Sequence, residues 1–159
     1  MARAAARLLE RTVPDRSLNY SAQLTQSLHA YVDYVEVNAA GYIALVRGAS
    51  GVDDHLRQIF EETRSSLAAR VTARLPAYGF TDGPAVRLLV RGWIALVEEV
   101  VLQWVADPAI AKTELIDVLV GSLPSLLAVG QAQDAPARAA QALAEVAAAV
   151  PVPPGGQSM

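Results

Sequence analysis

Apolar side chains recur along most of the chain at the spacing of an α-helix. In segment 18–38, for example, Leu24, Leu28, Tyr31 and Val35 fall on a single helical stripe. Prolines, glycines and capping residues interrupt this pattern, and no segment alternates as a strand would. The pattern predicts an all-α, single-domain helical bundle of about six to seven helices, over residues 2–13, 18–38, 39–47, 52–75, 84–105, 111–128 and 135–149.

Capping residues and prolines set the expected helix ends. Asp15 or Ser17 is predicted to cap helix 18–38, and Asn38 to cap the short helix 39–47. Asp134 is predicted to start a separate Ala-rich helix, and Pro124 to kink helix 111–128 or mark its last turns.

Four parts of the chain follow from these breaks. Residues 1–14 are predicted to form a linking helix that ends at Pro14, and 15–130 the main helical domain. Residues 131–150 are predicted to form the C-terminal Ala-rich helix, and the Pro- and Gly-rich residues 151–159 a disordered tail.

The two longest predicted helices differ in how their polar residues are arranged. Helix 52–75 has an inner stripe of Leu56, Phe60, Thr63, Leu67 and Val71. Its charged residues are assigned mostly to the solvent side: Arg57, Glu61, Glu62, Arg64, Arg70 and Arg74. Helix 84–105 is apolar on more than one side, which places it in the middle of the bundle.

The composition of the chain limits the classes of function that the protein can have. The 159 residues carry a formal net charge of -3, which argues against a surface that binds nucleic-acid phosphates. Apolar residues make up 53% of the chain, so an apolar surface covered by a second subunit is expected in addition to a core. Without cysteine or a signal peptide, the sequence suggests a cytoplasmic protein. The uncharged run 118–133 is interrupted by glycine and proline, so no membrane span is expected.

A search for catalytic chemistry finds no signature. His29 and His55 lie on different predicted helices, and neither has a second ligand at metal spacing. A Gly-rich phosphate loop, a G-x-S-x-G elbow and an HExxH motif are all absent from the sequence. The sequence therefore predicts a protein that is not an enzyme, with no cofactor and no metal.

Glu98 stands out because it lies inside an apolar helix. Arg91 is seven residues away, too far for a direct pair within the helix, so a partner on another helix or subunit is expected. The alternative is that Glu98 anchors a ligand. The aromatic residues have two similar readings, a filled core or the lining of a cavity: Tyr31, Tyr34, Tyr42, Phe60, Trp93 and Trp104.

Several segments resemble the regulatory domain of TetR-family transcriptional regulators. Tyr31-Val-Asp-Tyr-Val-Glu36 with Gly41-Tyr-Ile-Ala-Leu-Val-Arg-Gly48 resembles the helices that lead into that family's pocket. Leu88–Trp104 and Glu114–Val120 resemble its dimer-forming pair, and the agreement extends over residues 18–128. The resemblance implies a homodimeric domain that binds a small apolar or amphipathic effector. In that family an N-terminal helix-turn-helix binds operator DNA. The first thirteen residues offer at most one helix, so this head is expected to be missing.

The resemblance also implies site residues. The expected ligand-binding residues are Tyr34, Tyr42, Phe60, Trp93, Val97, Gln103 and Trp104, with Arg91, Glu98 or Gln103 as polar anchors. The expected dimer interface comprises Arg87, Arg91, Ile94, Glu98, Leu102, Leu115, Leu119, Leu123 and Leu126. A charge at Leu119 or Leu123 is predicted to split the dimer. Three alternatives stay open: a stand-alone carrier of apolar ligands, a ligand-free structural dimerisation module, and an enzyme of unrecognised type.

Overall fold

The computed structural model describes residues 19–39 and 54–149, together with Arg7, Glu10, Arg11, Val13 and Asp15; for 54–57, 59, 60 and 146–149 it describes only the backbone. Within these residues the chain forms α2 (Tyr20–Val37), α4 (Asp54–Thr72), the short 3-10 helix η1 (Leu75–Tyr78), α5 (Pro84–Ala106) and α6 (Lys112–Ala149). The prediction of an all-α domain is confirmed, and no strand occurs in the described part. The predicted helices 2–13 and 39–47 and the tail 151–159 fall almost entirely outside it.

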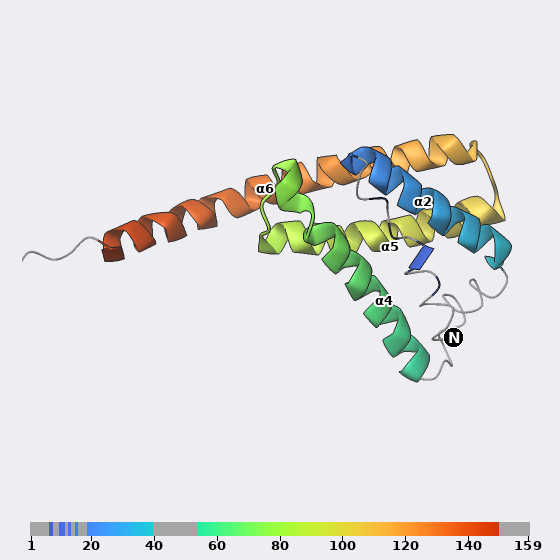
Figure 1. Cartoon of the computed structure of the whole chain (residues 1–159), viewed down its shortest axis with the longest axis horizontal. Coiled ribbons are helices and arrows are strands. Elements are labelled where there is room, and N and C mark those ends of the chain that lie inside the picture. The colour runs from blue at the N-terminus through green and yellow to red at the C-terminus, as the bar shows by residue number, and fades with distance from the viewer. Residues whose placement is uncertain are drawn as a thin grey trace, which may run out of the picture.

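Helices α5 and α6 form the centre of the domain. They run side by side in opposite directions, and α2 lies across both of them (Figure 1). Helix α4 begins away from the body and packs against α5 toward its C-terminal end. The C-terminal part of α6 extends well beyond the other helices (Figure 1). As a result α5 has neighbours on several sides, as its apolar circumference predicts.

The core lies mainly between α5 and α6. Both helices bury long runs of branched side chains, each of which stabilises the fold by about 1.5–3 kcal/mol when fully buried. Helix α5 contributes Val86, Val90, Val97, Val101 and Leu102, and α6 contributes Leu115, Ile116, Leu119, Leu123 and Leu127. The indole N–H of Trp93 links the two helices, since it donates to the Ser122 hydroxyl at 2.9 Å and to the Leu119 carbonyl at 3.3 Å.

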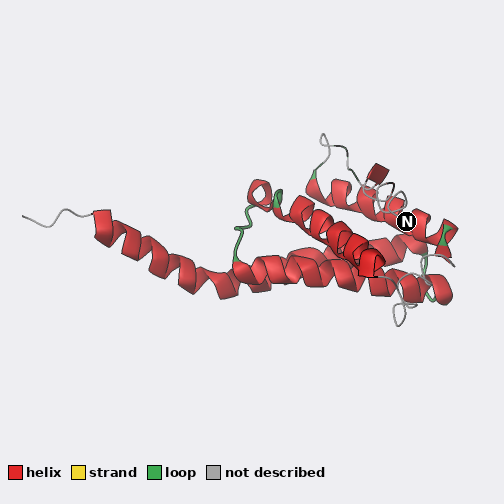
Figure 2. Ribbon diagram, turned by 90° about the horizontal axis from the view of Figure 1, so that it is seen from below, coloured by secondary structure: helices red, strands yellow, loops and turns green. Residues whose placement is uncertain are grey.

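The extent of α6 differs from the prediction made from the sequence. The two helices expected over 111–128 and 135–149 form one continuous helix, which runs through Pro124 and Pro136. A proline removes one backbone hydrogen bond and tends to kink a helix, but α6 continues through both. Gly130, which lies between them, packs closely against Val86 at the start of α5. Asp134 does not cap a new helix; its carboxylate faces the backbone of α5. Figure 2 shows that α6 bends where it passes the start of α5.

The ends of α2 also differ from expectation. Asn19 is its N-cap, not Asp15 or Ser17, because the Asn19 side chain accepts a hydrogen bond from the Ala22 N–H at 2.9 Å. At the other end, the Asn38 amide donates to the Tyr34 carbonyl at 2.7 Å. Asn38 therefore closes α2.

The stretch Lys112–Glu145 of α6 is long and apolar enough to cross a membrane by length and composition. This is weak evidence, since a core helix of a soluble protein meets the same criteria. In this fold the first half of the stretch packs against α5 and α2 and supplies the leucines of the core.

Candidate ligand-binding cavity

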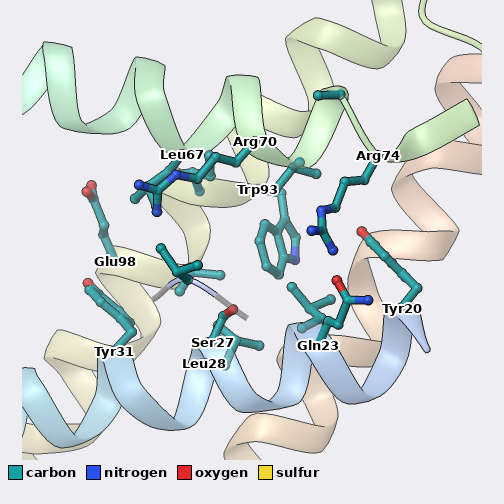
Figure 3. Close-up of a pocket in the computed structure, with 16 residues that line it drawn as sticks. Tyr20, Gln23, Ser27, Leu28, Tyr31, Leu67, Arg70, Arg74, Trp93 and Glu98 are labelled. Carbon is teal, nitrogen blue, oxygen red and sulfur yellow. The ribbon is translucent and has the colours of Figure 1, made fainter. Parts of the chain in front are cut away.

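A cavity of about 450 Å³ lies between α2, α4 and α5. Its size falls within the range of roughly 300–1,000 Å³ that is usual for small-molecule sites. The walls are mostly apolar, with a few polar groups among them (Figure 3). The lining residues are Val13, Tyr20, Gln23, Leu24, Ser27, Leu28, Tyr31, Leu67, Arg70, Val71, Ala73, Arg74, Trp93, Ile94, Val97 and Glu98.

Helix α2 supplies one wall through a regular stripe. Its lining residues recur at intervals of three and four, so they share one face of the helix. They are Tyr20, Gln23, Leu24, Ser27, Leu28 and Tyr31. This stripe begins one turn earlier than the stripe expected from the sequence, which started at Leu24. The extra turn is what brings the polar groups of Tyr20 and Gln23 to the cavity.

Helix α4 and the turn after it supply the opposite wall. Leu67 and Val71 line the cavity, as members of the predicted inner stripe. Arg70 and Arg74 line it too, although the sequence assigned the charged residues of this segment mostly to solvent. A signal for this was present, because positions 67, 70, 71 and 74 follow the spacing of one helical face.

Helix α5 forms the floor with Trp93, Ile94, Val97 and Glu98. The Glu98 residue is only 8% exposed. Its carboxylate accepts hydrogen bonds from Arg64 of α4, with N–O distances of 2.6 and 2.8 Å. The prediction that the partner of Glu98 comes from another helix or subunit is therefore confirmed, because that partner is on α4. The hydrogen bond to Glu98 is also the main cause that raises the pKa of Arg64.

The ion pair extends into a small network between α4 and α5. Glu61 contacts Arg64 at 3.1 Å and also Arg91 of α5 at 3.1 Å. Only the Arg64–Glu98 pair is largely shielded from water, so it is the strongest electrostatic link between the two helices. The outer pairs are exposed, and each of them contributes little on its own.

Tyr20 and Arg74 bring polar groups to the end of the cavity opposite Glu98 (Figure 3). The Tyr20 hydroxyl is buried and has no hydrogen-bond partner among the described residues. The Tyr20 ring lies 4.4 Å from that of Tyr78, centroid to centroid. Burial, followed by repulsion from Tyr78, raises the pKa of Tyr20 from 10.0 to about 12. Figure 3 shows the Arg74 guanidinium pointing toward the Trp93 ring and the Tyr20 hydroxyl.

The expected ligand-binding residues are divided by the structure. Trp93 and Val97 lie in the cavity wall, and so does Glu98, one of the expected anchors. Tyr34, Gln103 and Trp104 are not among the lining residues. Gln103 is exposed and donates to Glu99, while the Trp104 indole donates to the Ile110 carbonyl at 2.8 Å. Tyr42 and the side chain of Phe60 lie outside the described residues.

The expected dimer residues fall into two groups, those at the surface of the single chain and those in its core. Arg87 and Arg91 are exposed, and Leu126 is half-buried. The others are buried inside the single chain: Ile94, Glu98, Leu102, Leu115, Leu119 and Leu123. A charge at Leu119 or Leu123 would therefore disrupt the core of one chain before it could act on a contact between chains.

Other apolar residues of these two helices face outward. Leu88 and Leu96 are exposed on α5, and Val118 and Val129 are exposed on α6. Exposed apolar side chains on two neighbouring helices are typical of a surface that a partner covers.

Together, the fold and the cavity define an all-α domain that encloses a space of ligand size beside its central helix. Comparison with known proteins identifies the family. Residues 20–126, well over half of the chain, match the family model of the tetracyclin repressor-like, C-terminal domain. The chain belongs to this family.

A solved structure gives the same result. The crystal structure of a TetR-family transcriptional regulator from Streptomyces coelicolor is similar to this chain, with a TM-score of 0.75 and 29% sequence identity. The match covers 87% of this chain and 62% of the regulator, so the chain spans less than two thirds of that protein's length. A search of the curated proteins found no match.

Proposed function

We propose that the chain is the small-molecule-sensing and dimerisation domain of a TetR-like transcriptional regulator. The observation that carries this proposal is the apolar cavity of about 450 Å³ between α2, α4 and α5. A solid core would suffice for a structural module, whereas an apolar space with a few polar groups at its ends suits a ligand. TetR-family regulators are generally not enzymes, and no catalytic step is assigned to this site.

The proposed mechanism uses the link between α4 and α5. Trp93 and Glu98 of α5 contact the cavity, and Arg64 joins Glu98 to α4 from outside the cavity. A ligand that displaces Glu98 or fills the space beside Trp93 changes the position of α4 relative to α5. In a full regulator this movement would alter the spacing of two helix-turn-helix heads, and with it the affinity for operator DNA.

Dimerisation is assigned to the outward faces of α5 and α6. Two copies of this helix pair would form a four-helix contact around a two-fold axis. The residues that support this assignment are Leu88, Leu96, Val118 and Val129, which are exposed in the single chain. They replace the buried leucines as the best candidates for the contact.

Native mass spectrometry of the purified chain tests both parts of the proposal. We expect a dimer that carries an apolar or amphipathic small molecule, or that gains thermal stability when such compounds are added. A ligand-free monomer whose melting temperature responds to no compound would overturn the proposal and leave a structural module. A monomer that carries a ligand would instead favour a stand-alone carrier.

A further inference from the structure

The charges that face the cavity are not balanced. Two positively charged side chains and one negatively charged side chain reach its wall. They are Arg70, Arg74 and Glu98. The Glu98 carboxylate is already neutralised by Arg64, which approaches from outside the cavity. The Glu98 carboxylate is therefore not available to balance the charge of Arg74.

Arg74 is the clearest source of this imbalance. Its side chain forms no ion pair or hydrogen bond with the other described residues. It is half-buried, and it points into the cavity beside Trp93 (Figure 3). A wholly apolar ligand would cover this guanidinium without giving it a partner, which is unfavourable for a charge that loses water.

Tyr20 adds a second unused donor at the same end. Its hydroxyl is buried without a hydrogen-bond partner among the described residues, and Figure 3 shows it on the same side of Trp93 as Arg74. Because its pKa is raised to about 12, the group keeps its proton at physiological pH and can donate. Two donors, one of them charged, thus lie at the end of the cavity opposite Glu98.

Resting on the proposed function, we propose that the effector is an amphipathic carboxylate. Its apolar body fills the space between Leu24, Leu28 and Val97, and its carboxylate accepts from Arg74 and Tyr20. The planar guanidinium matches a carboxylate with two parallel hydrogen bonds, and the tyrosine supplies a third. A protonated amine would be repelled by the positive charge of Arg74. Among the described residues that line the cavity, Glu98 is the one carboxylate that could pair with an amine, and it is already paired with Arg64.

Three probes with the same apolar chain test this inference: decanoate, decanol and decylamine. Isothermal titration calorimetry and thermal melting are measured on the full chain at concentrations where the probes remain monomeric. We expect decanoate to bind about tenfold or more tightly than decanol or decylamine, as a charge-assisted contact predicts.

Variants locate the head group. Arg74→Gln should remove the preference for decanoate and leave decanol binding within about twofold of wild type. Arg138→Gln, on α6 away from the cavity, makes the same change of charge and should leave the binding of all three probes unchanged. Tyr20→Phe should weaken decanoate binding while the ligand-free protein becomes no less stable, because the lost hydroxyl has no partner. If Arg74→Gln does not fold, Arg74→Lys keeps the charge and tests the loss of the planar fork.

The outcomes separate the two proposals. If decanol or decylamine binds as tightly as decanoate, or if Arg74→Gln weakens all three equally, the carboxylate assignment is wrong while the ligand-binding function stands. If none of the probes binds, and a wider panel of apolar compounds also leaves the melting temperature unchanged, both proposals fail.

Discussion

The Asp134 carboxylate of α6 accepts a hydrogen bond from the backbone N–H of Val86, at the start of α5, at 3.1 Å. Its other oxygen accepts from the Ala85 N–H at 3.0 Å. The N-cap residue of α5 is Gly83, which has no side chain to satisfy these N–H groups. A residue almost fifty positions later in the chain therefore caps α5, and its negative charge lies where the helix dipole favours it.

Replacing Asp134 should destabilise the domain. Asp134→Ala leaves one buried and one partly buried N–H group without acceptors, so the free energy of unfolding should fall by about 1–3 kcal/mol. Urea denaturation at a fixed protein concentration measures the change. Asp117→Ala, on the exposed side of the same helix, is the control and should stay within about 0.5 kcal/mol of wild type. Equal effects of the two substitutions would contradict the capping role.

This cap also explains an error of sequence interpretation. Asp134 follows an apolar helix and precedes an Ala-rich segment, which is the local pattern of an N-cap. Sequence patterns describe only neighbours along the chain, whereas the N–H groups that Asp134 satisfies belong to a different helix. The class of fold and the position of α5 followed from periodicity, but this long-range contact could not.

Two glycines of α6 should respond in opposite ways to alanine. A Cβ at Gly130 would lie 3.1 Å from the backbone of Val86, where neither helix can move without disturbing the core. Gly130→Ala should therefore lower the free energy of unfolding by about 1–3 kcal/mol. At Gly121 a Cβ meets nothing within 4 Å in the single chain, and Gly121→Ala should raise it by about 0.5–1 kcal/mol.

Thermal melting of the Gly130→Ala and Gly121→Ala variants tests these two predictions. If Gly130→Ala is as stable as wild type, the close packing of α6 against α5 is wrong. A loss of stability in Gly121→Ala would contradict the open surroundings of that residue and would place it at a contact between chains.

The residues of the cavity were only partly predictable. The family resemblance implied Trp93 and Val97 as lining residues, and both line the cavity. Trp104 has the same helical phase as Trp93 to within a fraction of a turn, yet it lies beyond the cavity, with its indole bonded to the Ile110 carbonyl. Periodicity indicates which side of a helix is covered, but not where along that side a neighbouring helix ends.

The burial of Tyr20 predicts a loss of stability at high pH. In the folded chain its pKa is about 12, against 10.0 for the ordinary side chain, so the folded state holds this proton more strongly than the unfolded state. Between pH 10 and about 12 the unfolded chain binds fewer protons, and stability falls as the pH rises. Below pH 10 the Tyr20 hydroxyl is protonated in both the folded and the unfolded state, so this group does not make stability depend on pH there.

Melting temperatures measured across this pH range test the assignment. Wild type should lose stability more steeply than Tyr20→Phe, which has no hydroxyl to ionise at this position. Tyr34→Phe is the control for the other tyrosines and should follow wild type. Parallel curves for wild type and Tyr20→Phe would show that Tyr20 is not the group responsible.

Adjacent residues of α6 separate the contact between chains from the core of one chain. Val118 is 62% exposed, whereas Leu119 is 1% exposed and packs against α5. Val118→Glu should therefore give a folded monomer if the outer face of α6 forms the dimer, because a charge at a paired apolar surface opposes association. Leu119→Glu places an unpaired charge in the core and should cost about 3 kcal/mol or more of stability.

Light scattering after size exclusion gives the mass of each variant, and circular dichroism reports its folding. Val37→Glu is the matched control, since Val37 is 82% exposed at the end of α2, away from the outer faces of α5 and α6. It should remain a folded dimer. A Val118→Glu protein that stays dimeric would remove α6 from the contact. A folded, monomeric Leu119→Glu protein would instead support the sequence prediction that Leu119 lies between the subunits.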